Sequence, residues 1–240
     1  TALHVVYSAD RGGWASDITV VPAADTWPWS TPYGEFTNVG TVVGRAANWD
    51  MDGDGLLTNA ESQGDLALLG MESRIGDITG WLPVSQVPND FSGLMVGYPA
   101  SGSGMMAESV YADASSMYGV YTTTSSLGAG ASGGPLLQTV GGVTSVVGVL
   151  SSGTPNNTAA TYAGLFLADT WSWLLNSMAA NDSLLHEKAS TKLTDLQIGL
   201  FGAELLMQRE NESITAQQQI VARDVGDGHP IKDKLLPGIH

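Results

Sequence analysis

The sequence predicts an all-β protein, and this class follows from its composition and from the way its apolar runs are interrupted. Of the 240 residues, 43% are hydrophobic, 14% are charged and 30 are glycine. Val, Thr and Ser gather in short runs separated by Gly, Pro, Asn and Asp, which is typical of strands joined by turns. Such runs dominate the chain as far as about residue 168. A disordered chain would hold fewer apolar and more charged residues, so a packed core is expected.

The clearest expected strands form a hairpin. The β-rich runs 135–140 and 143–150 flank Gly141-Gly142, and a two-glycine connection favours a tight turn. Shorter extended segments are expected at Ile18–Val21, Leu66–Leu69, Gly93–Gly97, Val110–Tyr111 and Gly119–Thr123.

Helices are expected towards the end of the chain. The stretch 168–180 predicts a helix that Asp169 or Thr170 could cap. Apolar residues then recur every three to four positions, which predicts a second amphipathic helix before a loop or frayed end at 226–240. These apolar positions are Leu193, Leu196, Leu200, Ala203 and Met207.

The charge of the chain is acidic and unevenly distributed. The formal net charge is −15, which argues against nucleic acid as a partner because such binding needs a basic surface. The segment 1–180 holds 3 of the 9 basic and 15 of the 24 acidic residues, so the segment 181–240 holds the other 6 and 9. This shift predicts a domain boundary near residue 180.

Other features bear on the compartment. The chain has no cysteine, so no disulfide is expected and the redox environment stays open. No apolar run approaches the roughly 18 residues that a membrane span needs. The sequence begins without Met and without a signal peptide, so we expect a piece of a longer protein. Its acidic charge fits an exported protein or one that binds cations.

The most informative stretch is Gly128-Ala-Gly-Ala-Ser132-Gly-Gly-Pro-Leu-Leu137. A hydroxyl nucleophile in acyl transfer needs backbone N–H groups that converge on the developing oxyanion. A serine in a tight glycine-rich turn can supply that geometry, with the N–H groups of Gly130 and Ser132 as the donors. The glycines at 133 and 134 leave room for a substrate backbone. A hairpin loop without chemistry is the alternative.

This stretch resembles the nucleophile loop of trypsin-like serine proteases. The same letters also satisfy Gly-x-Ser-x-Gly, the nucleophile elbow of α/β-hydrolases, which requires a helix directly after the serine. Pro135 and the expected hairpin follow here instead. In the α/β-hydrolase order the base would be His186, His229 or His240, in the polar end of the chain. The trypsin-like interpretation is therefore favoured.

The expected general base is His4. A serine hydroxyl becomes a useful nucleophile when an imidazole takes its proton and a carboxylate orients that imidazole. His4 is the one histidine in the segment 1–180. Its run Thr1-Ala2-Leu3-His4 is similar to the Thr-Ala-x-His run around the general base of the trypsin-like family. Leu3 stands where that family usually has Ala or Gly, and an incidental surface histidine is the alternative.

The resemblance assigns the orienting acid to Asp65, in Gly64-Asp-Leu-Ala-Leu-Leu69. The family places its aspartate at the head of an Asp-[Ile/Leu]-Ala-Leu-Leu strand, and an ordinary aspartate before a strand is the alternative. The order His4, Asp65, Ser132 is the chymotrypsin-like order. The resemblance therefore implies a catalytic triad of these residues and a double six-stranded β-barrel, with the first barrel truncated before His4.

Two further runs, Ile75-Gly-Asp-Ile-Thr-Gly-Trp81 and Gly97-Tyr-Pro99, resemble the bacterial glutamyl-endopeptidase-like branch of this family. By the same resemblance, Ser126 lies at the base of the primary substrate pocket, so Lys or Arg is not the expected preference. Glutamyl-specific relatives have a histidine where Leu150 falls, so small or apolar side chains are expected. The predicted substrate-binding residues are Ser126, Leu150, Ser151 and Gly153.

The run 50–61 matches the twelve-residue calcium loop of EF-hands at every ligand position. Gly55 supplies the sharp turn, and three aspartates this close repel one another without a cation. Long flanking helices are not expected, and a solvated acidic turn is the alternative. The predicted ligands of a structural Ca²⁺ are Asp50, Asp52, Asp54, the carbonyl of Leu56, Thr58 and Glu61.

Together these inferences predict a partial first β-barrel at 1–75, a second barrel with its closing helix at 76–180, and an accessory tail at 181–240. The predicted function is that of a secreted, periplasmic or cell-surface serine endopeptidase that cleaves polypeptides through an acyl-enzyme. Two other functions stay open. One is a non-catalytic calcium-binding module on a protease fold, and the other is an α/β-hydrolase esterase.

Overall fold

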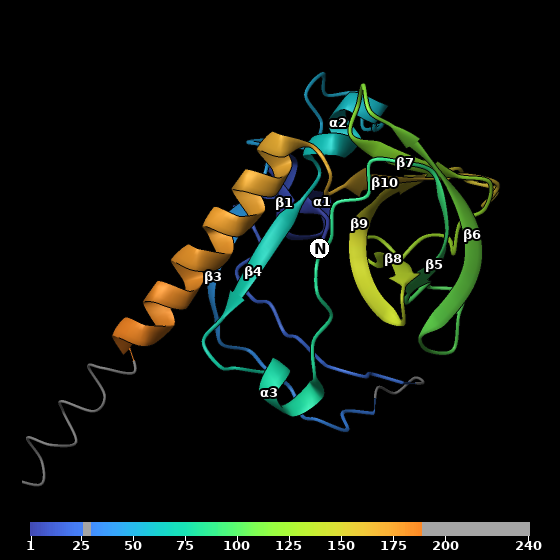
Figure 1. Ribbon diagram of the computed structural model, residues 1–240. Coiled ribbons are helices and arrows are strands. Elements are labelled where there is room, and N and C mark those ends of the chain that lie inside the picture. The colour runs from blue at the N-terminus through green and yellow to red at the C-terminus, as the bar shows by residue number, and fades with distance from the viewer. Residues whose placement is uncertain (26–29, 189–240) are drawn as a thin grey trace, which may run out of the picture. The chain divides into compact units, whose positions relative to one another are not determined.

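A closed β-barrel forms the most regular part of the protein (Figure 1). The computed structural model describes residues 1–25 and 30–188. Six strands, each antiparallel to its neighbours, close the barrel in the order β10-β7-β6-β5-β8-β9. They are β5 (Phe91–Gly97), β6 (Met106–Ser115), β7 (Val120–Thr123), β8 (Pro135–Val140), β9 (Val143–Gly153) and β10 (Ala160–Gly164).

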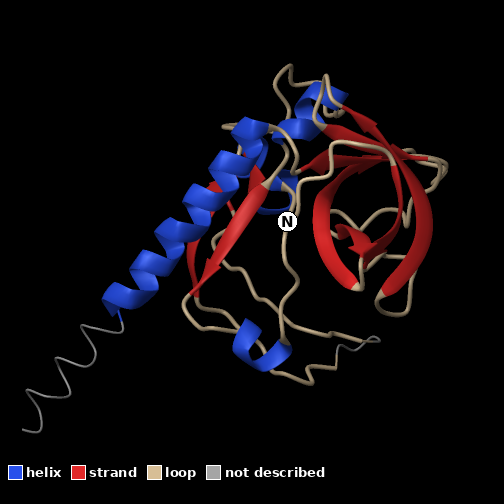
Figure 2. Cartoon of the chain, viewed as in Figure 1, coloured by secondary structure: helices blue, strands red, loops and turns tan. Residues whose placement is uncertain are grey.

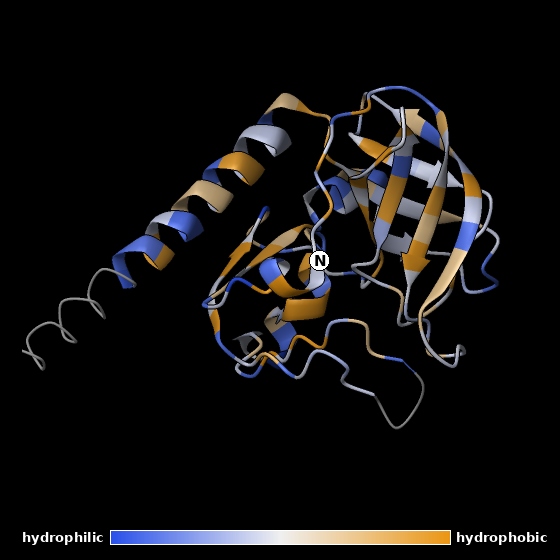
Figure 3. Cartoon of the chain, turned by 60° about the horizontal axis from the view of Figure 1, so that its bottom comes forward, coloured by the Kyte–Doolittle hydropathy of each residue, from blue (hydrophilic) through white to orange (hydrophobic). Residues whose placement is uncertain are grey.

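The barrel is closed around large buried side chains. Tyr121 and Tyr162 are almost fully buried, and Phe91 and Phe166 meet the Tyr121 ring edge-on at centroid distances of 5.3 and 5.0 Å. Burial raises the pKa of both tyrosines. Figure 3 shows hydrophobic and hydrophilic stretches alternating along the barrel strands, as expected where one face of a strand is buried. The all-β class predicted from the sequence is therefore confirmed for this part of the chain.

The hairpin between β8 and β9 is confirmed. Val140 pairs with Val143, and Gly141 and Gly142 have φ angles of 59° and 82°. A two-residue turn with positive φ at both positions has a twist that matches the strands it joins, which explains the Gly-Gly pair.

The segment before the barrel contains short elements. They are α1 (Leu3–Val6), β1 (Tyr7–Ser8), η1 (Ala9–Arg11), β2 (Gly13–Trp14), β3 (Val39–Gly44), α2 (Asn59–Gly64), β4 (Ala67–Met71) and α3 (Gly76–Thr79). Strand β1 pairs with β2 and strand β3 with β4, so this part of the chain contains two separate two-stranded sheets.

One closed barrel of the predicted double barrel is therefore confirmed, and the partial first barrel predicted at 1–75 is not confirmed by residues 1–25 and 30–188. Between β2 and β3, Pro, Gly and Asp interrupt the chain, and pairing is limited to single bridges such as Val20 with Phe36. The expected strand Ile18–Val21 amounts to that one bridge. Strand β3, in contrast, was not expected from the sequence.

A long helix follows β10 and appears as the orange ribbon of Figure 1 and the longest blue coil of Figure 2. It covers residues 168–188, so Asp169 and Thr170 lie in its first turn and do not cap it. It also continues past residue 180, where the end was expected. The chain divides into compact units Thr1–Leu185 and His186–His240, and the second predicted helix, with the 226–240 stretch, lies outside the described residues. No helix in the described ranges is long and apolar enough to cross a membrane.

Candidate active site

The side chain of His4 is joined to the carboxylate of Asp65. Asp65 Oδ2 lies 2.7 Å from His4 Nδ1, and Oδ1 accepts the backbone N–H of His4 at 2.8 Å. The carboxylate is fully buried, whereas the imidazole is 22% exposed. An imidazole that donates Nδ1–H to a carboxylate keeps Nε2 as an acceptor, which is the state a general base needs.

A third contact completes the surroundings of Asp65. The hydroxyl of Ser151, in β9, donates to Asp65 Oδ2 at 2.7 Å. Ser151 is 2% exposed, so this hydrogen bond is shielded from water. Binding of substrate by Ser151 stays a prediction, and its hydroxyl also holds Asp65.

Local structure explains how His4 and Asp65 meet although they lie far apart in the sequence. The backbones of Thr1 and Ala67 exchange hydrogen bonds in both directions, at 3.1 and 2.9 Å, which ties the segment before α1 to the start of β4. Leu3, Val6 and Ala67 then pack in one buried cluster. Asp65 lies between α2 and β4, and this arrangement brings it against His4.

The predicted nucleophile loop forms two consecutive tight turns. The N–H of Ala131 bonds to Gly128 O at 3.2 Å, and that of Gly134 bonds to Ala131 O at 2.9 Å. Gly130 has a φ of 93°, a left-handed conformation that favours glycine. A Cβ at Gly134 would lie 2.3 Å from the carbonyl oxygen of Val96, so no larger residue fits there without moving the backbone.

The segment after Ser132 is strand β8, beginning at Pro135. The elbow of an α/β-hydrolase requires a helix at this point. Because a strand and not a helix follows Ser132, the Gly-x-Ser-x-Gly letters do not form the elbow of an α/β-hydrolase here.

Three backbone N–H groups of the loop, those of Ala129, Gly130 and Ser132, form no hydrogen bond with the described residues. Among the described residues, no acceptor lies within hydrogen-bond distance of the N–H of Gly130 or of Ser132. These are the two amides that the sequence predicts as oxyanion donors. Gly130 is exposed and Ser132 is half-buried, so both amides are accessible to a ligand oxygen as oxyanion donors must be.

Strand β9 brings the serine loop close to the His4–Asp65 pair. Leu150 exchanges backbone hydrogen bonds with Gly133 and Gly134, both at 2.9 Å, and the next residue, Ser151, binds Asp65. Gly133 also packs on Thr1, since a Cβ there would lie 2.4 Å from Thr1 Oγ1. No hydrogen bond links Ser132 to His4 in the described chain, and such bonds are often long before substrate binds.

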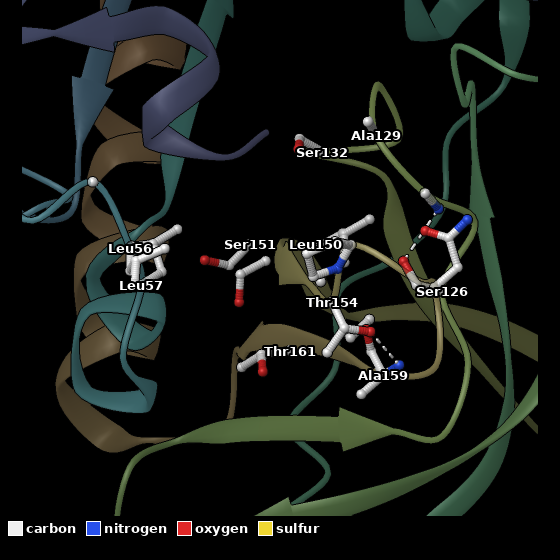
Figure 4. A pocket seen from close by; sticks show the side chains of 17 residues that line it. Leu56, Leu57, Ser126, Ala129, Ser132, Leu150, Ser151, Thr154, Ala159 and Thr161 are labelled. Carbon is white, nitrogen blue, oxygen red and sulfur yellow. Dashed lines mark hydrogen bonds between the residues drawn. The ribbon is translucent and has the colours of Figure 1, made fainter.

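A pocket of about 640 Å³ adjoins Ser132 (Figure 4). All four predicted substrate-binding residues line it, and no charged side chain does so. Ser126 accepts the N–H of Gly128 at 3.1 Å and is therefore fixed to the serine loop. The predicted residues are Ser126, Leu150, Ser151 and Gly153.

Sequence reasoning missed one wall of this pocket. Leu56 and Leu57, from the acidic loop before α2, also line it, and in Figure 4 they lie across from Ser126 with Ser151 and Leu150 between. Leu56 is 70% exposed. An exposed Leu pair within an acidic run is unusual, but the sequence holds no pattern that connects residue 56 to residue 132.

In the acidic loop, carboxylate oxygens of Asp50, Asp52 and Asp54 lie within 4.8 Å of one another. Asp50 accepts the N–H groups of Gly53 and Gly55 at 2.7 and 2.9 Å. The pKa of Asp52 is raised: the N–H of Asp54 favours its charged form, but desolvation and the neighbouring carboxylates of Asp54, Glu61 and Asp50 outweigh that hydrogen bond. Oxygen donors so placed suit a hard cation such as Ca²⁺.

Glu61 lies apart from this group of three aspartates. It is 4% exposed and forms a capping box with Thr58 at the start of α2. Its two oxygens accept the N–H groups of Met51 and Thr58, each at 2.9 Å, and the Thr58 hydroxyl at 2.7 Å. These hydrogen bonds from Thr58 and Met51 lower the pKa of Glu61. Both oxygens of Glu61 therefore already accept hydrogen bonds, and Ca²⁺ binding by the loop stays a prediction.

Comparison with known proteins identifies the fold. Neither a protein-family model nor a curated protein sequence matches the chain. A Glu endopeptidase solved in complex with MPD is similar, with 18% identity and a TM-score of 0.60 over 75% of this chain and 80% of that chain. The protease Anisep from Arthrobacter nicotinovorans shares 22% identity and a TM-score of 0.56 over 70% of this chain and 77% of that chain.

A third solved structure is the thermostable serine protease AL20 from an extremophilic microorganism. It shares 20% identity and a TM-score of 0.55, over 80% of this chain and 83% of that chain. At these identities the likeness concerns the fold. The chain therefore has a trypsin-like fold, mostly β, with one closed six-stranded barrel in its described part.

Proposed function

We propose that the protein is a serine endopeptidase in which Ser132 is the nucleophile, His4 the general base and Asp65 the residue that orients the base. The observation that carries the proposal is the buried Asp65 carboxylate, which binds the backbone N–H and Nδ1 of His4 and the hydroxyl of Ser151. The trypsin-like fold and the free amides beside Ser132 support it.

The expected reaction proceeds in two steps. Ser132 Oγ attacks the peptide carbonyl carbon and passes its proton to His4 Nε2. His4 then gives that proton to the leaving amine as the C–N bond breaks, which leaves an acyl group on Ser132. Water, activated by the same imidazole, hydrolyses this ester and restores the serine.

Each neighbouring group has a defined role in these steps. The N–H groups of Gly130 and Ser132 stabilise the negative charge that develops on the carbonyl oxygen. Asp65 fixes the imidazole tautomer and stabilises the imidazolium. Because Asp65 is fully buried, its hydrogen bonds are not in competition with bulk water.

The pocket beside Ser132 favours small or apolar side chains on the acyl side of the cleaved bond. Its lining is free of charge, and Leu56, Leu57 and Leu150 add apolar surface. A Lys, Arg, Asp or Glu side chain would lose hydration there without a charged partner.

We also propose that the acidic loop binds Ca²⁺ through Asp50, Asp52, Asp54, the carbonyl of Leu56, Thr58 and Glu61. The ion would neutralise the clustered carboxylates. In the same loop Leu56 lines the substrate pocket, so order in the loop and order in the pocket are expected to be linked. Export from a bacterial cell fits the acidic, cysteine-free composition.

The test is cleavage of a peptide library by the wild-type protein and by Ser132→Ala, with the products identified by mass spectrometry. The wild type is expected to cut after small or apolar residues. Ser132→Ala is expected to lower kcat by about 10⁶-fold with an unchanged melting temperature. A folded wild type that cuts no peptide, with or without Ca²⁺, would contradict the proposal and favour a non-catalytic module.

A further inference from the structure

A second pocket, of about 480 Å³, adjoins His4. It shares no lining residue with the pocket beside Ser132. Its walls come from α1, η1, β2 and the region just before the acidic loop. One pocket is therefore lined by Ser132 and the other by His4, and the two linings come from different parts of the chain.

The aromatic walls of this second pocket are fixed by specific contacts. Trp49 Nε1 donates to the carbonyl oxygen of Tyr7 at 3.1 Å, and its ring meets the His4 ring edge-on at a centroid distance of 6.1 Å. Trp14 meets the Tyr7 ring edge-on at 5.0 Å and is 46% exposed. Walls held in this way offer a formed surface to a ligand.

The chemistry of the proposed reaction indicates which part of a substrate meets this pocket. His4 delivers its proton to the leaving amine, so the imidazole must face the part of the peptide that departs. A pocket that contains His4, and none of the residues around the acyl-side pocket, is thus placed for residues on the leaving-group side of the cleaved bond.

Arg11 gives the second pocket a positive charge, and no Asp, Glu or Lys lines this pocket. Arg45 is paired with Asp169, and Arg74 with Asp77. No carboxylate forms an ion pair with Arg11 in the ranges that the structure describes. A guanidinium can bind a carboxylate through two parallel hydrogen bonds.

We propose that the pocket lined by His4, Arg11, Trp14 and Trp49 binds the leaving-group side of the substrate and favours a carboxylate there. The inference rests on the proposed peptidase function. The carboxylate comes either from an Asp or Glu side chain or from the free C-terminus of a short peptide. Asp10, next to Arg11 in sequence, does not line the pocket and forms no ion pair with Arg11 among the described residues.

The test uses matched internally quenched peptides with one acyl-side sequence, taken from the library peptide that the wild type cleaves best. In the first pair, one peptide has Asp and the other has Asn at the same position, which is one of the first three after the cleaved bond. A second pair has neutral residues there and ends at the second position after the bond, with either a free or an amidated C-terminus. kcat/KM is measured for wild type, Arg11→Gln and Arg74→Gln, at low ionic strength and in high salt.

We expect the wild type to prefer the carboxylate peptide of at least one pair by about fivefold, the upper range for an exposed ion pair. Arg11→Gln should bring that ratio close to one, and salt at about 1 M should reduce it because charges are then screened within about 3 Å. Arg74→Gln removes the same charge outside the pocket and should keep the preference. The pair whose ratio falls in Arg11→Gln shows whether the bound carboxylate is an acidic side chain or the C-terminus of the peptide.

Equal rates within both pairs for the wild type, or a preference that survives in Arg11→Gln, would overturn the inference while leaving the peptidase function intact. A wild type that cleaves none of the peptides overturns the proposed function itself, so the two failures are distinguishable.

Discussion

The two parts of the described chain that supply the site differ in how they are held together. In the barrel, each of the strands β5–β10 has two neighbours, and a continuous core of buried side chains fills the interior. In the segment before the barrel, each of the strands β1–β4 has one partner, and shorter contacts such as the Thr1–Ala67 pair join the pieces. The barrel supplies Ser132 and its loop, whereas His4 and Asp65 come from the less regular part.

This difference shows that the contact between His4 and Asp65 is made in a part of the chain with fewer strand pairings than the barrel. The connection between the two parts runs through β9, where Leu150 holds the serine loop and Ser151 holds Asp65. We therefore expect changes in the first part to affect activity more than stability, and changes inside the barrel to affect stability more.

The largest effect expected for a change in the segment before the barrel is that of Asp65→Asn. It keeps the shape of the side chain but favours the wrong tautomer of His4, so kcat is expected to fall by about 10⁴-fold. Peptide hydrolysis and the melting temperature are measured together. Full activity in this variant would show that Asp65 does not orient the base.

The next effect concerns Ca²⁺ and the acidic loop. Calcium at about 100 times its Kd should stabilise the protein by about 2.7 kcal/mol, because it binds the folded state. For a unit of this size that is roughly 5–10 °C in Tm. Thermal unfolding is compared with Ca²⁺, with Mg²⁺ and with a chelator.

The matched control for calcium is Asp52→Asn, which removes one predicted ligand charge and should reduce the shift in Tm. Identical melting curves with Ca²⁺ and with chelator would contradict calcium binding by this loop.

A pair of glycine substitutions compares the two parts directly. In β5 a Cβ at Gly93 would lie 2.5 Å from the carbonyl oxygen of Leu137, which is backbone, so Gly93→Ala should cost about 1–3 kcal/mol. In β3 the nearest atom to a Cβ at Gly40 is the flexible Glu72 side chain at 3.1 Å, so Gly40→Ala should stay within about 0.5 kcal/mol. Urea unfolding measures both. Equal costs would contradict the proposed difference in packing.

A further effect, on the pH dependence of stability, is expected at the start of α2. Hydrogen bonds lower the pKa of Glu61 from its ordinary 4.5, so its contribution to stability is present above that value and is lost as the pH falls through the lowered pKa. Thr58→Ala removes the capping hydroxyl and should cost about 1 kcal/mol at neutral pH. The difference in unfolding free energy between wild type and Thr58→Ala should become smaller as the pH falls below the ordinary pKa of 4.5. A difference that stays constant throughout the acid range would contradict this linkage.

Motifs made of adjacent residues could be predicted from the sequence. The runs around His4, Asp65 and Ser132 and the Gly141-Gly142 hairpin are local, and they led to the trypsin-like fold and to the candidate residues. The structure brings His4 and Asp65 into direct contact, and the roles in catalysis remain predictions.

Features that depend on packing between distant segments could not be predicted. The pairing of β3 with β4 joins segments without strong alternation, and Leu56 reaches the pocket through the fold of the whole acidic loop. The hydrogen bond that Ser151 donates to Asp65 was not predicted, because Asp65 lies far away in the sequence. A partial, truncated first barrel was expected by resemblance, and the two two-stranded sheets of the described segment before β5 do not confirm it.

The most direct test of the central claim is labelling with a fluorophosphonate, which reacts with an activated serine. We expect one adduct, mapped to Ser132 by mass spectrometry, that disappears in Ser132→Ala and in His4→Ala while both variants keep the wild-type melting temperature. An adduct that persists in His4→Ala, or a folded, calcium-loaded wild type that forms none, would contradict a nucleophile activated by the His4–Asp65 pair.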